Sequence, residues 1–347
     1  MSQRSVEESG SHSDRWRGLE WFAGIGGFAY AWPECPIVAA IDIDATARQV
    51  YQCNRTGQYL IREIETFGAD SIAELDANFW WMSPPCQPYS RRGNQFDVED
   101  RRAASLLHLI DLIGPLRPTA IALENVFGFA SSRACETLID ALRDFGYSTT
   151  MRELCPTQLG WPNRRPRIYL LASLEPLPPW RPLPHYDVTL RQLLRPAECR
   201  VDGRSAARSG DRVPLGEVVS VERPDAACEL SEADRNRFGC AMDRVNLNDV
   251  GAVTACFGSS YGKSLLRAGS YLVDGSRWRR FTPSEVARLL GLPPTFSMPE
   301  HIGTRRRWQL LGNSLSIPVV RYVLSHLPGG PSTVMDLEAE YAASEPV

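Results

Sequence analysis

Short runs of apolar residues alternate with amphipathic segments along the first half of the chain. The apolar runs predict buried β-strands at residues 18–22, 36–41, 78–83, 119–125 and 167–173. The segments between them space apolar residues at helical intervals and predict helices at 44–54, 105–114 and 134–146, the last two ended by Gly114 and Gly146. Strands and helices that alternate in this way favour an α/β fold with a mostly parallel sheet and helices on both of its faces.

The pattern changes after residue 173. Residues 174–184 are dense in proline, which neither a helix nor a central strand accommodates, and they predict a boundary. Residues 185–250 are charged and weakly periodic, so no element is predicted there. Helical periodicity returns at 281–293, where Thr282 and Glu285 form a capping box around Pro283, and again at 316–327. We expect a flexible arm at 1–17 and an acidic tail at 331–347.

The composition is that of a folded protein. In 347 residues, 43% hydrophobic and 23% charged side chains exclude wholesale disorder. No apolar stretch approaches the roughly 20 residues that span a bilayer, and the polar N-terminal residues lack the apolar core of a secretory signal, so no membrane partner is expected. The nine cysteines include no Cys-x-x-Cys pair and the five histidines are scattered, which predicts neither disulfides nor a metal site. We therefore expect a cytoplasmic protein.

A glycine turn follows the first predicted strand. Gly24, Gly26 and Ala29 have the spacing of a dinucleotide-binding turn, and Asp42 ends the next strand. Glycines let backbone amides and a helix N-terminus approach a ligand, and the acid can accept hydrogen bonds from ribose hydroxyls. The motif alone does not separate a nicotinamide cofactor from S-adenosylmethionine, and a turn that needs glycine for steric reasons alone would have the same sequence.

Cys86 stands in the segment SPPCQPYSRRG, directly after the strand predicted at 78–83. Two prolines stiffen this turn, and the ligand crevices of α/β sheets open at the carboxyl ends of their strands. Most lone cysteines are buried and inert. At this position Cys86 is a candidate nucleophile, and Arg91 and Arg92 would favour its thiolate form.

A carboxylate and two arginines occupy comparable positions. Glu124 ends an apolar strand, where partial burial would suit a general acid, although a solvated strand end is the simpler interpretation. In NRRPRIYLL, the alternation of a strand would put Arg165 and Arg167 on one face. They could form a functional pair or a basic surface ladder.

Five motifs carry a family resemblance. FAGIGG, PPCQPYS, ENV, NRRPRIYLL and GNSLSIPVV occur in the order seen in the cytosine-C5 methyltransferases, and the chain resembles that family over residues 18–175 and 250–327. The segments 156–167, 255–263 and 281–315 resemble the branch that keeps the DNA methyltransferase fold and methylates a tRNA anticodon loop. One departure is Gly258, which follows Cys256-Phe257 where that branch typically has threonine.

The resemblance implies a Rossmann-like S-adenosylmethionine-dependent methyltransferase fold with a smaller target-recognition domain. We expect a catalytic domain at 18–175, a target-recognition region at 176–300 and a return to the catalytic domain at 301–330.

The resemblance also implies a chemistry. Cys86 would add to C6 of cytosine and Glu124 would hydrogen-bond N3 of the ring. Arg167 would donate to O2, and Arg165 would support it or a neighbouring phosphate. Because these groups must surround the base, the target has to leave its stack or lie in a loop.

S-adenosylmethionine is the cofactor that the resemblance implies, and its binding residues carry over by position. Phe22, Gly24 and Gly26 would line its methionine and ribose. Asp42 would bind the ribose hydroxyls, and Ile43 would pack on the adenine. The other implied positions lie far apart in the sequence: Glu63 near the adenine amine, Pro84 beside the cofactor, and Asn313 and Ser314 at its amino-acid end.

The net charge of −3 averages over an uneven distribution. Residues 262–310 hold nine basic side chains against three acidic ones, interleaved with aromatic residues. A run of charge is commonly a solvated face, but arginines among aromatic rings suit phosphate contact and base stacking. We predict a nucleic-acid partner, contacted by Arg91, Arg92, Lys263, Arg279, Arg280, Arg305, Arg306 and Arg307.

Several functions stay open. The favoured one is methylation of cytosine C5 in tRNA, and the second is the same chemistry on DNA, for which residues 174–253 are short for an elaborate double-strand reader. A nicotinamide-dependent oxidoreductase would explain the glycine turn alone. A catalytically inactive nucleic-acid-binding homologue has no reason to keep Cys86, Glu124 and Arg167 together. The oligomeric state stays open, and a monomer is compatible with the sequence.

Overall fold

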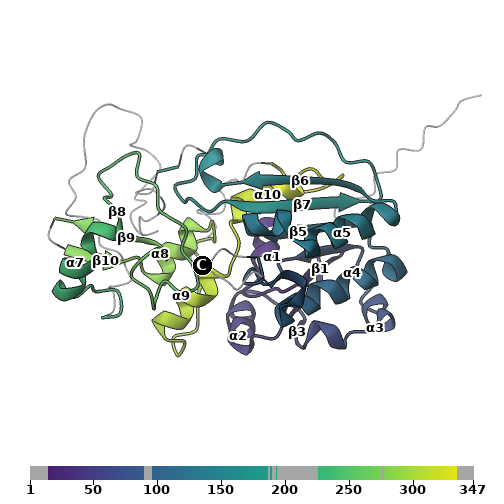
Figure 1. Ribbon diagram of the computed structural model, residues 1–347, viewed down its shortest axis with the longest axis horizontal. Helices are drawn as coiled ribbons and strands as arrows, with labels where there is room; N and C mark the ends of the chain where they lie inside the picture. The colour runs from purple at the N-terminus through teal and green to yellow at the C-terminus, as the bar shows by residue number, and fades with distance from the viewer. Residues whose placement is uncertain are drawn as a thin grey trace, which may run out of the picture.

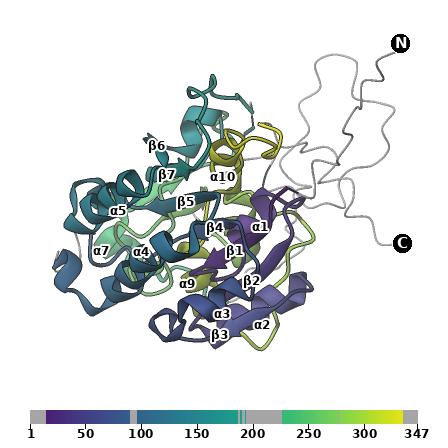
Figure 2. The ribbon, with the colours of Figure 1, turned by 90° about the vertical axis from the view of Figure 1, so that its right-hand side faces the viewer.

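The computed structural model describes residues 15–89, 96–186, 188, 189, 193, 226–275 and 277–333. Figure 1 shows two lobes side by side, a larger one built on a seven-stranded sheet and a smaller one that contains a three-stranded sheet. In Figure 2, the molecule is turned so that the larger lobe faces the viewer. This arrangement confirms the predicted α/β fold with a mostly parallel sheet, whereas the small second sheet was not predicted.

The large sheet has the strand order β3-β2-β1-β4-β5-β7-β6. Neighbouring strands from β3 to β5 pair in parallel, whereas β7 runs antiparallel to both β5 and β6. All five predicted strands are present. The strands are β1 Gly18–Trp21, β2 Ile37–Asp42, β3 Tyr59–Ile61, β4 Phe79–Met82, β5 Ala120–Asn125, β6 Ser148–Leu154 and β7 Arg167–Ser173.

Two strands were not predicted, and both lie at edges of the sheet. β3 has only three residues, and β6 alternates partly exposed and exposed positions over most of its length. An edge strand buries little surface, so its sequence lacks the apolar run that identifies a central strand.

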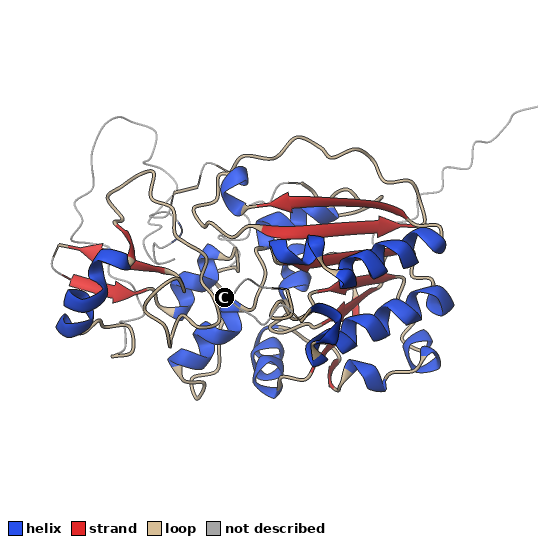
Figure 3. Ribbon diagram, in the orientation of Figure 1, coloured by secondary structure: helices blue, strands red, loops and turns tan. Residues whose placement is uncertain are grey.

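Helices cover both faces of the large sheet. Successive side chains of a strand point to opposite faces, and the central strands are apolar on both, so each face needs a layer of helices to bury it. Trp80 packs in one apolar layer with residues of α4 and α5, and Trp81 packs in the other with Phe28 of α1. The rings of Phe28 and Trp81 are stacked 5.7 Å apart. Figure 3 shows these helices beside the strands. The helices of this lobe are α1 Gly27–Ala31, α2 Ala45–Asn54, α3 Ala69–Ala73, α4 Ala104–Leu116 and α5 Arg133–Asp144.

Gly114 does not end its helix, contrary to the prediction. α4 continues to Leu116 and stops at Arg117, which adopts the left-handed conformation with φ 44°. A Cβ on Gly114 would lie 2.4 Å from the ring of Phe145, so this glycine allows α4 to pack closely on the end of α5. Gly146, by contrast, has φ 80° and follows the end of α5 as predicted.

The smaller lobe contains α7 Glu232–Phe238 and the strands β8 Asp243–Val245, β9 Ser270–Asp274 and β10 Arg277–Arg280. Three helices follow: α8 Pro283–Leu289, α9 Thr304–Gly312 and α10 Ile317–Leu324. The predicted capping box is confirmed, since Thr282 Oγ1 accepts from Glu285 N while Glu285 Oε2 accepts from Thr282 N.

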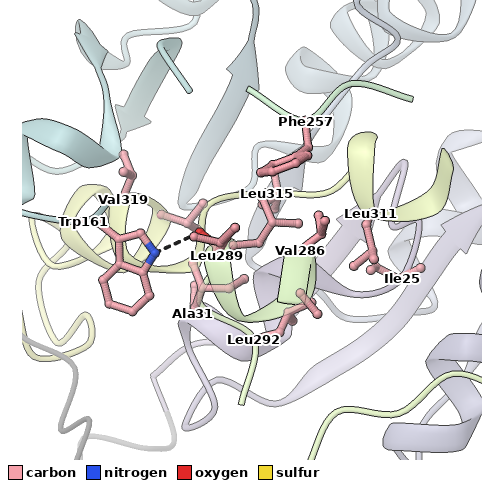
Figure 4. Packing of buried hydrophobic residues seen from close by; sticks show 14 of the residues in the cluster. Ile25, Ala31, Trp161, Phe257, Val286, Leu289, Leu292, Leu311, Leu315 and Val319 are labelled. Atoms are coloured by element: carbon pink, nitrogen blue, oxygen red, sulfur yellow. Dashed lines mark hydrogen bonds between the residues drawn. The ribbon is translucent and has the colours of Figure 1, made fainter. Parts of the chain in front are cut away.

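One continuous core joins the two lobes. Leu289 of α8 and Val319 of α10 pack with Phe257 and Ala31 in the same buried cluster, as Figure 4 shows. Trp161 Nε1 donates to the carbonyl oxygen of Leu289 at 2.8 Å across this cluster. Packing of this kind fixes the orientation of the smaller lobe relative to the sheet.

Two segments expected to be peripheral are tied to the core. Residues 174–184 form no helix or strand, as predicted, yet the Trp180 ring lies 4.5 Å from that of His326, which follows α10. Trp16, placed in the predicted flexible arm, is only 2% exposed because it packs against Trp32 and Phe79. The arm prediction is therefore wrong for residues 15–17, while 1–14 and most of the predicted tail lie outside the described residues.

Candidate active site

Cys86 lies in a turn held against the neighbouring strand. The turn follows the end of β4, and Asn125 Nδ2, at the end of β5, donates to the carbonyl oxygen of Pro84 at 3.2 Å. Tyr89 N donates to the carbonyl oxygen of Cys86 at 3.1 Å. A Cβ on Gly128 would lie 2.1 Å from the carbonyl oxygen of Tyr89, so glycine is required for this close approach. The cysteine is thus presented on a rigid loop, and Cys86 itself is partly exposed.

Glu124 and Arg167 meet at the same edge of the sheet. β7 runs antiparallel to β5 and pairs Tyr169 with Glu124, so the first residue of β7 lies beside the last residues of β5. Arg167 Nε lies 3.1 Å from Glu124 Oε1, and both side chains are largely buried. Arg167 Nη1 also donates to the carbonyl oxygen of Pro166 at 2.8 Å. The guanidinium is therefore fixed in orientation, and it keeps N–H groups for a further acceptor.

Arg165 precedes β7 and is not part of a strand, contrary to the prediction of a shared strand face. It is 3% exposed, and its guanidinium donates to the carbonyl oxygens of Phe257 and Gly312, each at 3.2 Å, and to that of Ser314. Buried cations need such partners. Both terminal nitrogens of Arg165 donate inside the protein, while its buried Nε has no partner among the described residues. Arg165 therefore supports the site and joins the two lobes.

The electrostatic surroundings of Cys86 come from these same groups. Burial raises the pKa of its thiol, Arg167 and Arg165 lower it, Glu124 raises it, and the net effect is an increase. The thiol form is therefore favoured over the thiolate. Arg91 and Arg92, predicted to favour the thiolate, lie outside the described residues.

A second cysteine, Cys256, approaches the same arginines. Its Sγ lies 3.5 Å from Arg165 Nη1 and 3.7 Å from Arg167 Nη2. Burial raises the pKa of the Cys256 thiol, but the two guanidiniums outweigh it and the net shift is downward. Cys256 and Glu124 in turn hold the pKa of Arg167 above its usual value against the effect of burial. The sequence had marked Cys256 only as part of a motif, because nothing local indicates this long-range contact.

The glycine turn has the geometry of a ligand cradle. Gly24 and Gly26 have φ values of 52° and 85°, which favour glycine, and a Cβ on Gly26 would lie 2.7 Å from the ring of Tyr51. Asp42 Oδ2 accepts a hydrogen bond from Gly24 N at 2.9 Å. Burial raises the pKa of Asp42, while backbone N–H donors oppose this shift. The turn and the acid are thus one hydrogen-bonded unit.

The other predicted cofactor residues differ in exposure. Ile43 is 67% exposed, although it is a large apolar side chain beside Asp42. Glu63 is exposed after β3, at the start of a single 3₁₀ turn. Asn313 is exposed and caps the C-terminal end of α9. Pro84 is buried under the Cys86 turn, and Phe22 is partly exposed with φ 54°.

Several buried polar atoms near these elements have no hydrogen-bond partner among the described residues. They include Oγ of Ser314 and Oε2 of Glu20 in β1. The other oxygen of Glu20 accepts from Phe28 N at 3.0 Å, in the first turn of the helix that follows the glycine turn, and burial raises the pKa of Glu20 to about 8. An orphaned buried polar atom needs a partner such as an ordered water, an ion or a ligand. No sequence pattern marks Glu20 as a functional residue, since it lies inside a strand.

Half of the predicted nucleic-acid contacts have partners inside the protein. Arg279 forms two hydrogen bonds with the buried Glu285, at 2.7 and 2.8 Å, and Arg306 pairs with Asp44. The guanidinium of Arg280 lies over the rings of Tyr271 and Trp308. The guanidinium of Arg307 donates to the backbone carbonyl oxygens of Pro299, Glu300 and Ile302. The prediction that these four bind phosphate is therefore not supported by their geometry.

Exposed cations do remain on the smaller lobe. Lys263 and Arg305, both predicted contacts, are exposed, and so are Arg267 and Arg277, which had not been selected. None of these four side chains has a hydrogen bond or ion pair to another described residue. In the parts of the chain that the structure describes, no cluster of His, Cys, Asp and Glu could hold a metal ion, and no helix is long and apolar enough to cross a membrane.

Comparisons with known proteins agree with this geometry. A family model described as C-5 cytosine-specific DNA methylase matches residues 16–201 and 225–328. The chain is 30% identical over 387 residues to a tRNA (cytosine(38)-C(5))-methyltransferase of Bos taurus, covering 90% of this chain and 98% of that protein. It is 27% identical to a DNA (cytosine-5)-methyltransferase of Dictyostelium discoideum, covering 90% and 94%. The crystal structure of the Schizosaccharomyces pombe Dnmt2 methyltransferase superposes with a TM-score of 0.73 at 27% identity, covering 89% and 97%.

The fold and the comparisons define a methyltransferase, and its candidate site has a cysteine at the carboxyl edge of the sheet. The chain belongs to the cytosine-C5 methyltransferase family. It is an enzyme that methylates C5 of cytosine in nucleic acid, and S-adenosylmethionine is the methyl donor of its family. The predicted family, fold and type of reaction are thereby confirmed.

Proposed function

We propose that this enzyme methylates a cytosine of tRNA. The chemistry rests on one observation, the convergence of Cys86, Glu124 and Arg167 at one edge of the sheet. The choice of tRNA is supported by the similarity to the Bos taurus tRNA methyltransferase over 90% of this chain. The similarity to the Dictyostelium DNA methyltransferase supports a second candidate, the same reaction on DNA.

Gly258 bears on this choice of substrate. A Cβ at this position would have its nearest neighbour, the carbonyl oxygen of Ala268, 3.9 Å away, so packing does not require glycine here. The residue follows Cys256 and Phe257, which both contact Arg165. A threonine at position 258 would therefore fit the same backbone, and glycine there leaves the contacts of Cys256 and Phe257 with Arg165 in place.

The catalytic residues would act together on the target base. Cys86 Sγ forms a bond to C6 of cytosine, and the electron pair of the C5–C6 double bond moves toward C5. Glu124 holds a proton at N3 and Arg167 donates to O2, so the charge pushed onto the ring is offset. Once C5 carries the methyl group that S-adenosylmethionine would supply, loss of the C5 proton to water and departure of Cys86 as a thiolate would restore the aromatic base. An inactive homologue would have no need for the buried pair of Glu124 and Arg167.

The cofactor residues fit S-adenosylmethionine, which supplies an electrophilic methyl group when bound. The space where a Cβ of Gly24 would lie is open, and Asp42 can accept from ribose hydroxyls. The exposed face of Ile43 suits an adenine ring. At the other end, the unpartnered hydroxyl of Ser314 suits the amino-acid part of the ligand. Phe22, Pro84 and Asn313 would complete the site, and Glu63 would contact the adenine amine.

The test compares the two substrates directly. Purified enzyme is incubated with tritium-labelled S-adenosylmethionine and either total tRNA or duplex DNA, and incorporated label is counted. We expect label in tRNA and none in duplex DNA, and the Cys86→Ala variant gives the background. Label confined to duplex DNA would establish the second candidate. Label in neither substrate would contradict both.

The exposed cations of the smaller lobe are expected to bind the phosphate backbone. Replacing Lys263, Arg267 and Arg305 together by alanine should weaken tRNA binding and reduce the slope of log affinity against log salt by about 2–3, since each phosphate contact contributes roughly 0.7–0.9. The matched control is Arg307→Ala, which removes donors to backbone carbonyls. It should lower the unfolding temperature and leave the slope unchanged. If the salt dependence of tRNA binding is unchanged in the triple variant, these three side chains face solvent and do not contact phosphates.

A further inference from the structure

Arg306, in the first turn of α9, forms an ion pair with the residue that begins α2. Its Nη2 lies 2.5 Å from both carboxylate oxygens of Asp44, and both side chains are about one-third exposed or less. Arg306 Nη1 donates to Gln309 Oε1 at 2.8 Å, one turn further along α9. The guanidinium is therefore held from two sides and directed at the larger lobe. This contact joins residues 262 positions apart.

Asp44 is hydrogen-bonded to the acid that would bind the cofactor ribose. Its backbone N–H donates to Asp42 Oδ1 at 2.9 Å, while Asp42 Oδ2 accepts from Gly24 N at the same distance. The side chain of Asp44 also caps α2, because its Oδ1 accepts from Thr46 N and Ala47 N. The conformation of Asp44 thus sets the position of Asp42 and of the exposed Ile43 between them.

The negative charge of Asp44 disfavours the ionised form of the neighbouring Asp42. Besides burial, the nearby carboxylate of Asp44 raises the pKa of Asp42. Asp42 must be ionised to accept hydrogen bonds with all its lone pairs, because a protonated carboxyl is in part a donor. A cation that pairs with Asp44 reduces the repulsion between the two acids. Arg306 supplies that cation from the other lobe.

We infer that Arg306 is a cofactor-positioning residue, which acts through Asp44 to hold Asp42 in place for the ribose of S-adenosylmethionine, and that it is not a nucleic-acid contact. The same helix ends at Asn313 and is followed by Ser314, which would close the amino-acid end of the ligand. α9 and the residue after it would therefore support the cofactor at its ribose, through Arg306 and Asp44, and at its amino-acid end, through Asn313 and Ser314. The inference rests on the proposed binding of S-adenosylmethionine at Asp42.

The experiment compares Arg306→Gln with the adjacent Arg305→Gln, whose arginine is exposed and makes no hydrogen bond or ion pair to another described residue. Calorimetry measures S-adenosylmethionine affinity, and steady-state kinetics give KM for the cofactor and for tRNA separately. Arg306→Gln should raise the cofactor Kd and KM about tenfold, with kcat at saturating cofactor and KM for tRNA changed less than twofold. Arg305→Gln should instead raise KM for tRNA and leave the cofactor Kd unchanged.

A second pair of variants separates positioning from folding. Asp44→Asn keeps an oxygen to cap α2 but removes the charge that Arg306 offsets. The double variant Asp44→Asn/Arg306→Gln should therefore bind the cofactor more tightly than Arg306→Gln alone. If the double variant binds no better, or if Arg306→Gln keeps wild-type cofactor affinity while tRNA binding weakens, the inference is wrong. Absence of S-adenosylmethionine binding by the wild-type protein would instead contradict the proposed function itself.

Discussion

Replacement of Cys86 by alanine is expected to reduce the rate of methyl transfer by about 10⁴-fold or more, because the variant has no nucleophile to add to C6 of cytosine. The other catalytic residues act together with Cys86 and cannot compensate for its loss. S-adenosylmethionine binding should persist, since the Cys86 turn is fixed by contacts of Pro84 and Tyr89 that do not involve the thiol. Tritium transfer to nucleic acid measures the first quantity, and calorimetry the second.

Two further measurements make this result specific. Cys53→Ala removes an exposed thiol on α2 and should keep wild-type turnover, which controls for loss of a cysteine as such. An RNA or DNA substrate carrying 5-fluorocytosine should trap the wild-type enzyme as a covalent adduct, because fluorine at C5 cannot leave as a proton. Mass spectrometry should find this adduct on the peptide with Cys86. An adduct that survives in Cys86→Ala, or methyl transfer within tenfold of wild type, would exclude Cys86 as the nucleophile.

The sequence was sufficient to predict the central strands of the large sheet and the positions of the functional residues at their carboxyl ends. Each apolar run gives a strand, and the carboxyl ends of parallel strands meet at one edge, so Cys86 and Glu124 could be placed together before the structure was known. The direction of β7 could not be predicted in this way. Because β7 is antiparallel to β5, its first residue, and not its last, reaches Glu124.

The charged residues were harder to assign from the sequence than the apolar ones. A run such as 305–307 has the same local pattern whether its members face solvent or another lobe. In the structure, Arg305 is exposed, Arg306 pairs with Asp44 and Arg307 binds backbone carbonyls. These partners lie on elements brought together only by folding, and side-chain periodicity carries no information about them. Cys256 was left unassigned for the same reason, since its contacts with Arg165 and Arg167 span about 90 residues.

Arg167 connects the acid of the site, Glu124, with its two cysteines, Cys86 and Cys256. Arg167 contacts Glu124 on one side and Cys256 on the other, and it lowers the pKa of Cys86 while Glu124 raises it. A base that hydrogen-bonds to Glu124 and accepts from Arg167 would change both influences on the thiol.

Glu124→Gln is expected to reduce kcat by about 10²–10⁴-fold, the range for loss of a positioned proton donor. Glutamine has nearly the same size but cannot hold an exchangeable carboxyl proton at N3. It also leaves the guanidinium of Arg167 without its carboxylate partner in a largely buried site, which costs stability. Single-turnover methyl transfer at saturating cofactor measures the chemical step, and the unfolding temperature measures the loss of the ion pair.

Glu124→Asp separates these two effects, because it keeps the carboxyl and the negative charge but withdraws them by one methylene. If proton donation is the role of Glu124, the aspartate variant should keep more activity than the glutamine variant, even though both weaken the contact with Arg167. If the role is only to pair with Arg167, activity should instead follow the unfolding temperature across the two variants. Glu124→Gln with kcat within twofold of wild type would remove Glu124 from the mechanism, and the charge on the ring would then have to be offset by Arg167 alone.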